Sequence, residues 1–268
     1  MTLAKLSQLD RVKLFQQLEG ELVRNCPELI TEANDAADGV IDLLNASKQE
    51  IWEQLWDKPF FGNTVSKSAE DSIEKFKSVF VPSLFRMELD SADFGIEMKS
   101  DRKRDKNGQF TTKYSFQLTG ARLIDVEDKK HFKKPRIYMA VAAGQWLCRF
   151  PETQIERLLY TPLDALVPWL QEELGRGWNH VTVMHFLTDC GICCNPDTHM
   201  VDAARYFELI APKNSPDKKL SDALDLVSKV KALTKSLYGV QTGPRLRYVD
   251  KLLMEFGRKE LIPRKQTK

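Results

Sequence analysis

No stretch of the sequence approaches the roughly 20 consecutive apolar residues that a membrane-crossing helix needs. Residues 1–25 also lack the apolar block and the small-residue cleavage site of a signal peptide. They alternate apolar and charged residues with a helical period instead. These absences predict a soluble protein that is not exported and has no membrane partner.

Cysteine is scarce, with five residues at no regular spacing. An odd, irregular set argues against a disulfide framework and fits the reduced thiols of a cytoplasmic protein. Cys190, Cys193 and Cys194 lie near His185 and His199 in the sequence. The C-x-x-C-C spacing offers one pair of zinc ligands and no second pair. We therefore expect buried thiols, a cytoplasmic location and no bound metal.

Internal repeats and low-complexity tracts are absent too, and a composition of 42% hydrophobic and 29% charged residues is ordinary for a globular protein. A chain of 268 residues fills one large core or two modest lobes that share a cleft. We expect residues 1–135 to form an N-terminal helical region with a β-hairpin at 92–118, and residues 136–268 to form a second helical region. The predicted fold class is mainly α, with a small β-hairpin insertion.

Positive charge is concentrated in two segments, although the formal net charge is only +2. Residues 101–136 hold 11 basic and 5 acidic residues, and residues 213–268 hold 14 and 6. The rest of the chain is acidic. Because a phosphate backbone responds to local potential, this segregation favours a basic face for a polyanion. Solvated loops and a basic tail are the alternative on charge alone.

Helical periodicity runs through most of the chain. The first apolar stripe consists of Leu3, Leu6, Leu9, Val12, Phe15, Leu18 and Leu22. The predicted helices cover residues 3–22, 27–44, 49–56, 68–79, 137–146, 151–159, 163–174, 180–190, 200–209, 221–238 and 245–257. Between them, alternation of apolar and polar residues around Asn107-Gly108 predicts the hairpin.

The segment from Val167 to Leu209 carries the most information about chemistry. A helix ends there in a Gly175-Arg176-Gly177 turn, a second helix follows from about Asn179, and Pro196-Asp197-Thr198-His199 opens a third. Glycines at such a hairpin let another backbone approach, and amides at a helix start hold a phosphate oxygen.

This arrangement resembles the helix-hairpin-helix (Gly/Pro-Asp) DNA glycosylase superfamily. In that family, a glycine hairpin between two helices precedes by about twenty residues a Val-Asp-Thr-His-like turn whose Asp is catalytic. Here Gly177 lies twenty residues before Asp197, and the stretch from Tyr248 to Gly257 is similar to the family's late helix. The resemblance implies a two-lobed helical fold that binds double-stranded DNA. It implies Asp197 as the catalytic residue and Gly175, Arg176, Gly177 and Asn179 as phosphate-binding residues.

Two departures from the family narrow the expected activity. Bifunctional members place a Schiff-base lysine just after the hairpin, where this chain has Trp178 and Asn179. Without that amine, no covalent imine and no strand scission are expected, so the enzyme should be monofunctional. No cysteine follows Cys194, so the iron–sulfur loop of some members is missing and no cofactor is expected.

An aspartate suits this chemistry because breaking a nucleoside C–N bond makes the sugar oxocarbenium-like. The start of a helix should keep Asp197 ionised. The same residue is also a good helix N-cap, which is a purely structural role, and both roles can coexist.

Enzymes that act on a base in duplex DNA extrude it into a pocket, where aromatic side chains stack on it. The base-pocket candidates are Gln145, Trp146, Trp178 and His199. Core packing is the alternative for the tryptophans, and capping or packing is the alternative for the histidine.

The sequence thus favours a monomeric, monofunctional DNA glycosylase that removes a damaged or modified base. A modified base of the kind found in bacteriophage DNA is one substrate hypothesis, which would place the enzyme in antiviral defence. The first alternative is a transferase on the same scaffold that hypermodifies thymine-derived bases in phage DNA. The second is a non-catalytic DNA-binding module.

Overall fold

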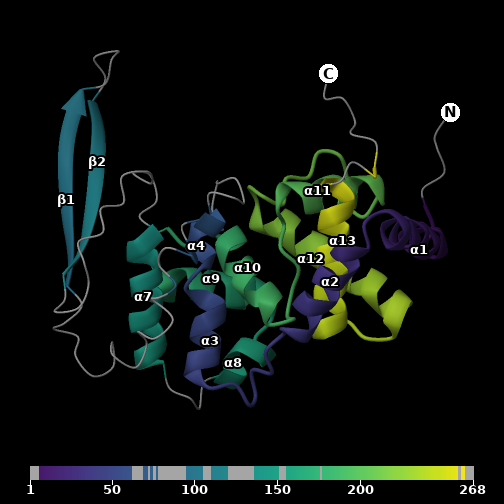
Figure 1. Cartoon of the computed structure of the whole chain (residues 1–268), viewed down its shortest axis with the longest axis horizontal. Helices are drawn as coiled ribbons and strands as arrows, with labels where there is room; N and C mark the ends of the chain where they lie inside the picture. Colours follow the sequence, from purple (N-terminus) through teal and green to yellow (C-terminus); the bar gives the residue numbers. More distant parts are fainter. Residues whose placement is uncertain are drawn as a thin grey trace. The chain divides into compact units, whose positions relative to one another are not determined.

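The computed structural model describes residues 6–61, 69–71, 73–74, 77, 95–104, 110–119, 136–150, 155–175, 177–258 and 261–262. Within them the chain is mainly helical, as the sequence predicts. The helices are α1 (Gln8–Asn25), α2 (Pro27–Asp38), α3 (Lys48–Leu55), α4 (Lys58–Phe61), α7 (Arg136–Arg149), α8 (Ile155–Tyr160), α9 (Leu163–Leu174), α10 (His180–Asp189), α11 (Thr198–Tyr206), α12 (Leu220–Tyr238) and α13 (Pro244–Arg258) (Figure 1). In this described part, no helix combines the length and apolar character that a membrane span requires.

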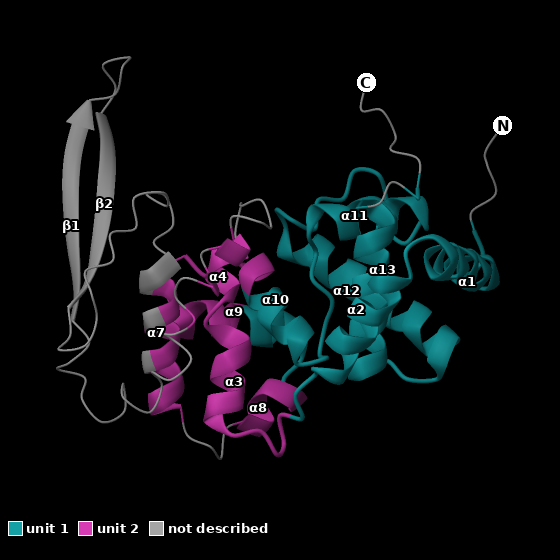
Figure 2. Ribbon diagram, viewed as in Figure 1, with its two compact units in different colours: residues 1–42, 161–167, 183–268 teal, residues 43–160, 168–182 magenta. Residues whose placement is uncertain are grey.

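The chain divides into two compact units, and unit 1 is assembled from segments far apart in the sequence (Figure 2). Unit 1 comprises residues 1–42, 161–167 and 183–268, and unit 2 comprises residues 43–160 and 168–182. Helices α9 and α10 each contribute residues to both units. The boundary predicted between residues 135 and 136 falls inside unit 2.

In unit 1, the first two helices pack with the last ones. Helix α1 contacts α2 and α12, while α13 contacts α2, α11 and α12. The rings of Phe15 and Phe256 meet edge to face with centroids 5.4 Å apart, and those of Phe207 and Phe256 stack at 6.2 Å. Such aromatic pairs stabilise the core beyond the area they bury.

The apolar stripe predicted for α1 is confirmed in its second half, where Phe15, Leu18 and Leu22 are buried. Leu9, which the prediction placed on the same stripe, is 62% exposed. It lies nine positions, or about 2.5 helical turns, before Leu18, and therefore on the opposite face. The stripe was extended too far towards the N-terminus.

Helix ends follow local capping signals. Ser7 begins α1 and Ser47 begins α3, each with a capping box. Helix α2 starts at Pro27, as predicted, but it ends at Asp38 rather than at Leu44. Gly39, which directly follows α2, has low helix propensity, so the longer prediction was wrong.

Unit 2 contains α3, α4, α7 and α8, and both α3 and α4 pack against α7. Ile51, Trp52 and Leu55 are the buried face of α3. The short helix α4 lies between residues 56 and 68, where the sequence predicts no helix. Phe60 in α4 packs edge to face on Trp56, with centroids 6.0 Å apart.

Two strands pair in an antiparallel sheet between residues 95 and 119. Strand β1 (Gly95–Arg104) pairs with β2 (Phe110–Thr119), and the register sets Gly95 opposite Thr119 and Arg104 opposite Phe110. The turn that carries Asn107-Gly108 lies outside the described residues, as does half of the helix predicted at 68–79.

Candidate functional site

The turn between α9 and α10 contains two glycines in the left-handed backbone region. Gly175 has φ +78° and Gly177 has φ +101°. The Gly175 amide donates to the Gln171 carbonyl at 3.1 Å, which closes the end of α9, and the Trp178 amide donates to the Gly175 carbonyl at 3.3 Å. The turn thus needs residues that adopt positive φ without strain. Arg176, between the glycines, lies outside the described residues.

The two glycines have different surroundings. A methyl group on Gly175 would meet no atom within 4 Å, whereas a methyl group on Gly177 would lie 2.5 Å from the sulfur of Met139. Gly177 is therefore required by packing inside unit 2. Gly175 is open, which makes it the glycine of the turn that another backbone can approach.

Asn179 has a local structural role. Its Oδ1 accepts hydrogen bonds from the Thr182 amide at 2.9 Å and from the Thr182 hydroxyl at 3.1 Å. This is the geometry of a helix N-cap, and it satisfies one of the unpaired amides at the start of α10. The capping signal was present in the sequence, because Asn directly precedes a helix, but the sequence analysis gave Asn179 only a phosphate-binding role.

Two of the pocket candidates, Trp178 and Trp146, are buried in unit 2. Trp178 is 3% exposed, and its indole N–H donates to the Met139 carbonyl at 3.1 Å, so it lies in the core of unit 2. Trp146 is buried as well, beside Phe150 and Trp169, with ring centroids 4.8 Å and 6.3 Å away. The side chain of Gln145 lies outside the described residues.

The Trp146 indole differs from that of Trp178 in one respect. Its Nε1 atom is buried and has no hydrogen-bond partner among the described residues. A buried N–H without a partner costs free energy, because the group loses its hydrogen bond to water. Arg157 covers the Trp169 end of this aromatic cluster, with its guanidinium carbon 4.1 Å from the ring centroid.

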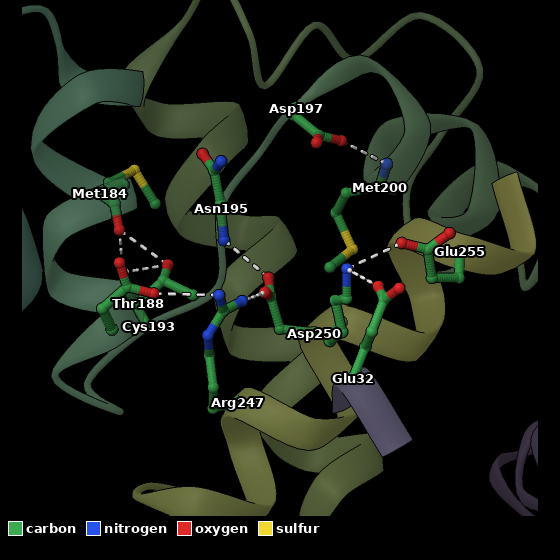
Figure 3. A network of polar contacts seen from close by, with 12 residues as sticks. Glu32, Met184, Thr188, Cys193, Asn195, Asp197, Met200, Arg247, Asp250 and Glu255 are labelled. Atoms are coloured by element: carbon green, nitrogen blue, oxygen red, sulfur yellow. Dashed lines mark hydrogen bonds and ion pairs between the residues drawn. The ribbon is translucent and has the colours of Figure 1, made fainter. Parts of the chain in front are cut away.

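Asp197 in unit 1 is the N-cap of α11. Its backbone is extended, with φ −74° and ψ 172°, and its Oδ1 accepts a hydrogen bond from the Met200 amide at 2.7 Å (Figure 3). The capping role expected from the sequence is thus present. The carboxylate is held where the amides and dipole of α11 favour negative charge.

The environment of Asp197 nevertheless raises its pKa above the ordinary value of 3.8. Burial is the largest cause, and it outweighs the amides of Met200 and His199 and the charge of His199, which all lower the pKa. Glu255 on α13 adds a smaller upward effect. Desolvation is therefore the stronger effect on the pKa of Asp197, and the amides at the start of the helix oppose it.

His199 is half-buried, and its backbone packs against α13. A methyl group on Gly257 would overlap the His199 carbonyl oxygen, so these two backbones are in direct contact. This contact fixes the first turn of α11 from the side opposite to solvent. The contact gives a packing reason for Gly257, which ends the stretch that is similar to the late helix of the glycosylase family.

A buried ion-pair network contacts the loop that directly precedes Asp197. Arg247 on α13 contacts Asp189 at 3.0 Å and Asp250 at 2.6 Å, and Asp250 Oδ1 accepts a hydrogen bond from the Asn195 amide at 2.9 Å (Figure 3). None of these four residues, Arg247, Asp189, Asp250 and Asn195, was predicted from the sequence as part of a site. The only signal was a pair of opposite charges at i and i+3 on one helix, which is common on exposed surfaces.

Charge and burial compete within this network. Burial raises the pKa of Asp250 to about 6, against the opposing effects of Arg247 and the Asn195 amide, and Asp197 and Asp189 raise it further. Burial alone would lower the pKa of Arg247, but Asp250 and Asp189 raise it overall. Arg247 therefore stays charged between two acids.

The cysteines near the site are buried thiols, as predicted. Cys190, Cys193 and Cys194 are buried and form no disulfide, and the Cys193 thiol donates to the Met184 carbonyl at 3.2 Å. Burial raises the pKa of Cys193 to about 12 and that of Cys194 well above its ordinary value. Thiols of this kind are poor nucleophiles at neutral pH. Among the described residues, no group of three or more His, Cys, Asp or Glu side chains has metal-binding geometry.

The arrangement around Asp197 can stabilise a cationic group that approaches the start of α11. It can also orient a water through the carboxylate, whose position is fixed by the cap. Comparisons of the chain with protein-family models, curated proteins and solved structures found no match.

Proposed function

We propose that this protein is a monofunctional DNA glycosylase of the helix-hairpin-helix type, with Asp197 as its catalytic carboxylate. The observation that carries the proposal is the placement of Asp197. It is a half-buried carboxylate fixed by the Met200 amide at the first turn of α11, and it follows the glycine turn between α9 and α10 by twenty residues.

In the proposed reaction, the ionised carboxylate of Asp197 lies next to a deoxyribose whose C–N bond is breaking. Positive charge develops on the sugar as the base leaves, and a fixed carboxylate in a desolvated site stabilises that charge mainly in the transition state. Water then adds to the sugar carbon and leaves an abasic site. Because burial raises the pKa of Asp197, the active ionised form should be lost at a higher pH than for an ordinary aspartate.

The turn between α9 and α10 supplies the proposed contact with double-stranded DNA. Gly175 has open space around its Cα, so a phosphate oxygen can approach the backbone there. Asn179 orders the start of α10 as its N-cap and supports the turn indirectly. The basic segments at 101–136 and 213–268 add charge for a polyanion. A two-lobed fold with an inserted hairpin is part of this proposal.

Hydrolysis without strand cleavage follows from the residues after the turn. Trp178 lies in the core and Asn179 caps α10, so neither offers an amine to a sugar carbon. A Schiff base therefore does not form at these positions. The proposed substrate class is a chemically modified base, and excision of such bases from phage DNA would serve antiviral defence.

The direct test is release of bases from genomic DNAs that differ in base modification, measured by mass spectrometry. The matched variant is Asp197→Asn, because asparagine keeps the N-cap and removes the charge. We expect the native protein to release one class of base and to leave alkali-labile sites, and the variant to release none while it still binds DNA.

Other outcomes contradict the proposal in distinguishable ways. Intact strands of altered mass would indicate a transferase that hypermodifies thymine-derived bases. Binding without chemistry, unchanged in Asp197→Asn and weakened when the open Gly175 is replaced by a bulky residue, would indicate a non-catalytic DNA-binding module.

A further inference from the structure

Helix α13 and the residues just before it hold the loop that leads to Asp197. At the N-terminal end of α13, the Gly243 amide donates to the Gly191 carbonyl at 2.7 Å. Both glycines have positive φ, and a methyl group on Gly191 would lie 2.6 Å from the Cα atom of Gly243. Two backbones that approach this closely fix the start of the loop.

A second contact lies one and a half turns into α13. Asp250 is 2% exposed, and its Oδ1 accepts a hydrogen bond from the backbone amide of Asn195. Only Pro196 separates Asn195 from Asp197. The third contact, between Gly257 and the His199 backbone, lies just after Asp197. The catalytic aspartate is therefore bracketed on both sides by contacts with one helix.

Of these three contacts, the middle one depends on a charged side chain. Asp250 is oriented by Arg247, which contacts its second oxygen, Oδ2, at 2.6 Å, and Arg247 is in turn held by Asp189 at the end of α10. The two carboxylate oxygens of Asp250 thus have different partners, one a guanidinium and the other a main-chain amide. A carboxylate held in this way has little freedom to rotate.

We propose that Asp250 is a positioning residue for the reaction, which fixes Asp197 through the Asn195 amide while Arg247 fixes Asp250. This inference rests on the proposed function of Asp197. Asp250 itself is buried and does not touch substrate. Buried charges are costly unless each of them is paired. Here Arg247 pairs with Asp250, and the other oxygen of Asp250 accepts a hydrogen bond from the main-chain amide of Asn195.

The first test measures the position of the loop without any substrate. Hydrogen exchange of the Met200 amide reports the cap that Asp197 makes, and the ratio of its exchange rate to that of the Val230 amide in α12 removes the effect of global stability. Asp250→Leu keeps the branching of the side chain at Cγ but removes the acceptor, so we expect this ratio to rise about tenfold, the loss of one hydrogen bond. Asp250→Asn keeps an acceptor for the Asn195 amide and should restore most of the protection.

The matched control is Tyr248→Phe, on the same helix. The Tyr248 hydroxyl donates to Glu19 Oε1 at 2.7 Å, so this variant removes a hydrogen bond of α13 that does not involve the loop. The exchange ratio should stay near the native value in the control. If Asp250→Leu does not fold, Arg247→Gln serves as the second variant, since it removes the charge that orients Asp250, and an intermediate rise is expected. An unchanged ratio in the Asp250 and Arg247 variants would overturn the proposal.

The second test uses base release from the DNA that the native protein attacks. A positioning role predicts that Asp250→Leu lowers kcat and leaves KM near the native value, with Tyr248→Phe unchanged in both. Equal losses in the two variants would mean that Asp250 acts through stability alone. If no DNA yields a released base, the proposed function fails, while the exchange measurement still decides whether Asp250 positions Asp197.

Discussion

Gly257 in α13 packs directly against the backbone carbonyl of His199 in α11, so the two helices meet backbone to backbone beside the candidate catalytic residue. A side chain at this position has no space. The close approach holds the first turn of α11, and it can be tested with glycine substitutions that have opposite expected signs.

Gly257→Ala should destabilise the protein by about 1–3 kcal/mol, because the added methyl group meets a main-chain carbonyl that cannot move aside. The control is Gly20→Ala in α1, where a methyl group meets no atom within 4 Å. That variant should be more stable by about 0.5–1 kcal/mol through helix propensity. Urea unfolding of both variants gives the comparison, and equal effects would contradict a backbone contact at Gly257.

The two glycines of the α9–α10 turn provide a similar pair. Each has positive φ, so alanine should cost about 1 kcal/mol of strain at either position. Gly177→Ala should cost about 1–3 kcal/mol more, because its methyl group must displace the Met139 side chain. The difference in free energy of unfolding isolates the packing effect. Similar values for both variants would show that Met139 moves away without cost.

Substitutions of Asp197 separate its capping role from its charge. Asp197→Ala should lower the free energy of unfolding by about 1 kcal/mol, because the Met200 amide loses its acceptor. Asp197→Asn should leave stability near the native value, since asparagine is an equally good N-cap. Thermal and urea unfolding measure both. A large loss of stability in Asp197→Asn would mean that the charge itself stabilises α11.

The tryptophans of unit 2 offer a test of hydrogen-bond satisfaction. Trp178→Phe removes an indole N–H that donates to Met139, whereas Trp146→Phe removes a buried N–H without a partner among the described residues. Both changes remove a similar volume. We therefore expect Trp178→Phe to cost about 1 kcal/mol more than Trp146→Phe in urea unfolding. The reverse order would indicate that the Trp146 N–H has a partner.

The pH dependence of stability should carry the signature of Asp250. Its pKa of about 6 in the folded protein lies above its ordinary value of 3.8, so the folded state binds this proton more tightly than the unfolded state. The stabilisation is complete below the ordinary pKa and is lost as the pH rises through the folded pKa. Relative to Asp250→Asn, which does not titrate, the native protein should lose about 3 kcal/mol between about pH 4 and pH 7.

Unfolding in urea at several pH values measures this difference. All other carboxylates are the same in the native protein and in Asp250→Asn, so their contributions cancel in the comparison. A native protein that gains stability over Asp250→Asn as pH rises would show the opposite sign. It would mean that Arg247 holds Asp250 ionised despite burial.

The sequence predicts most helices of this protein because their apolar periods and capping residues are local. The starts predicted at residues 27 and 49 lie within one residue of those of α2 and α3, whereas the start predicted at residue 3 lies five residues before that of α1. The predictions for Leu9 and for the end of α2 were wrong. At 3.6 residues per turn, Leu9 lies on the face of α1 opposite to Leu18. Gly39 directly follows α2 and has low helix propensity, so the helix does not extend to Leu44.

Around Asp197, the sequence predicts the cap but not the network that surrounds it. The cap depends on a residue three positions away, whereas Asp250 and Asn195 are 55 positions apart. Only tertiary packing brings them together. The upward shift in the pKa of Asp197 was missed for the same reason, because burial depends on residues from several helices. Trp178 was assigned to a pocket by its position in the sequence, and its depth in the core comes from α7.

The pairing of the first helices with the last ones has a consequence for synthesis on the ribosome. Helix α2 ends at Asp38, and its partner α13 does not begin until Pro244. At 5–20 residues per second, the nascent chain waits roughly 10–40 seconds before that partner is translated. During that interval the faces of α1 and α2 that pack on α12 and α13 lack these partners, so apolar surface of the nascent chain stays exposed to water.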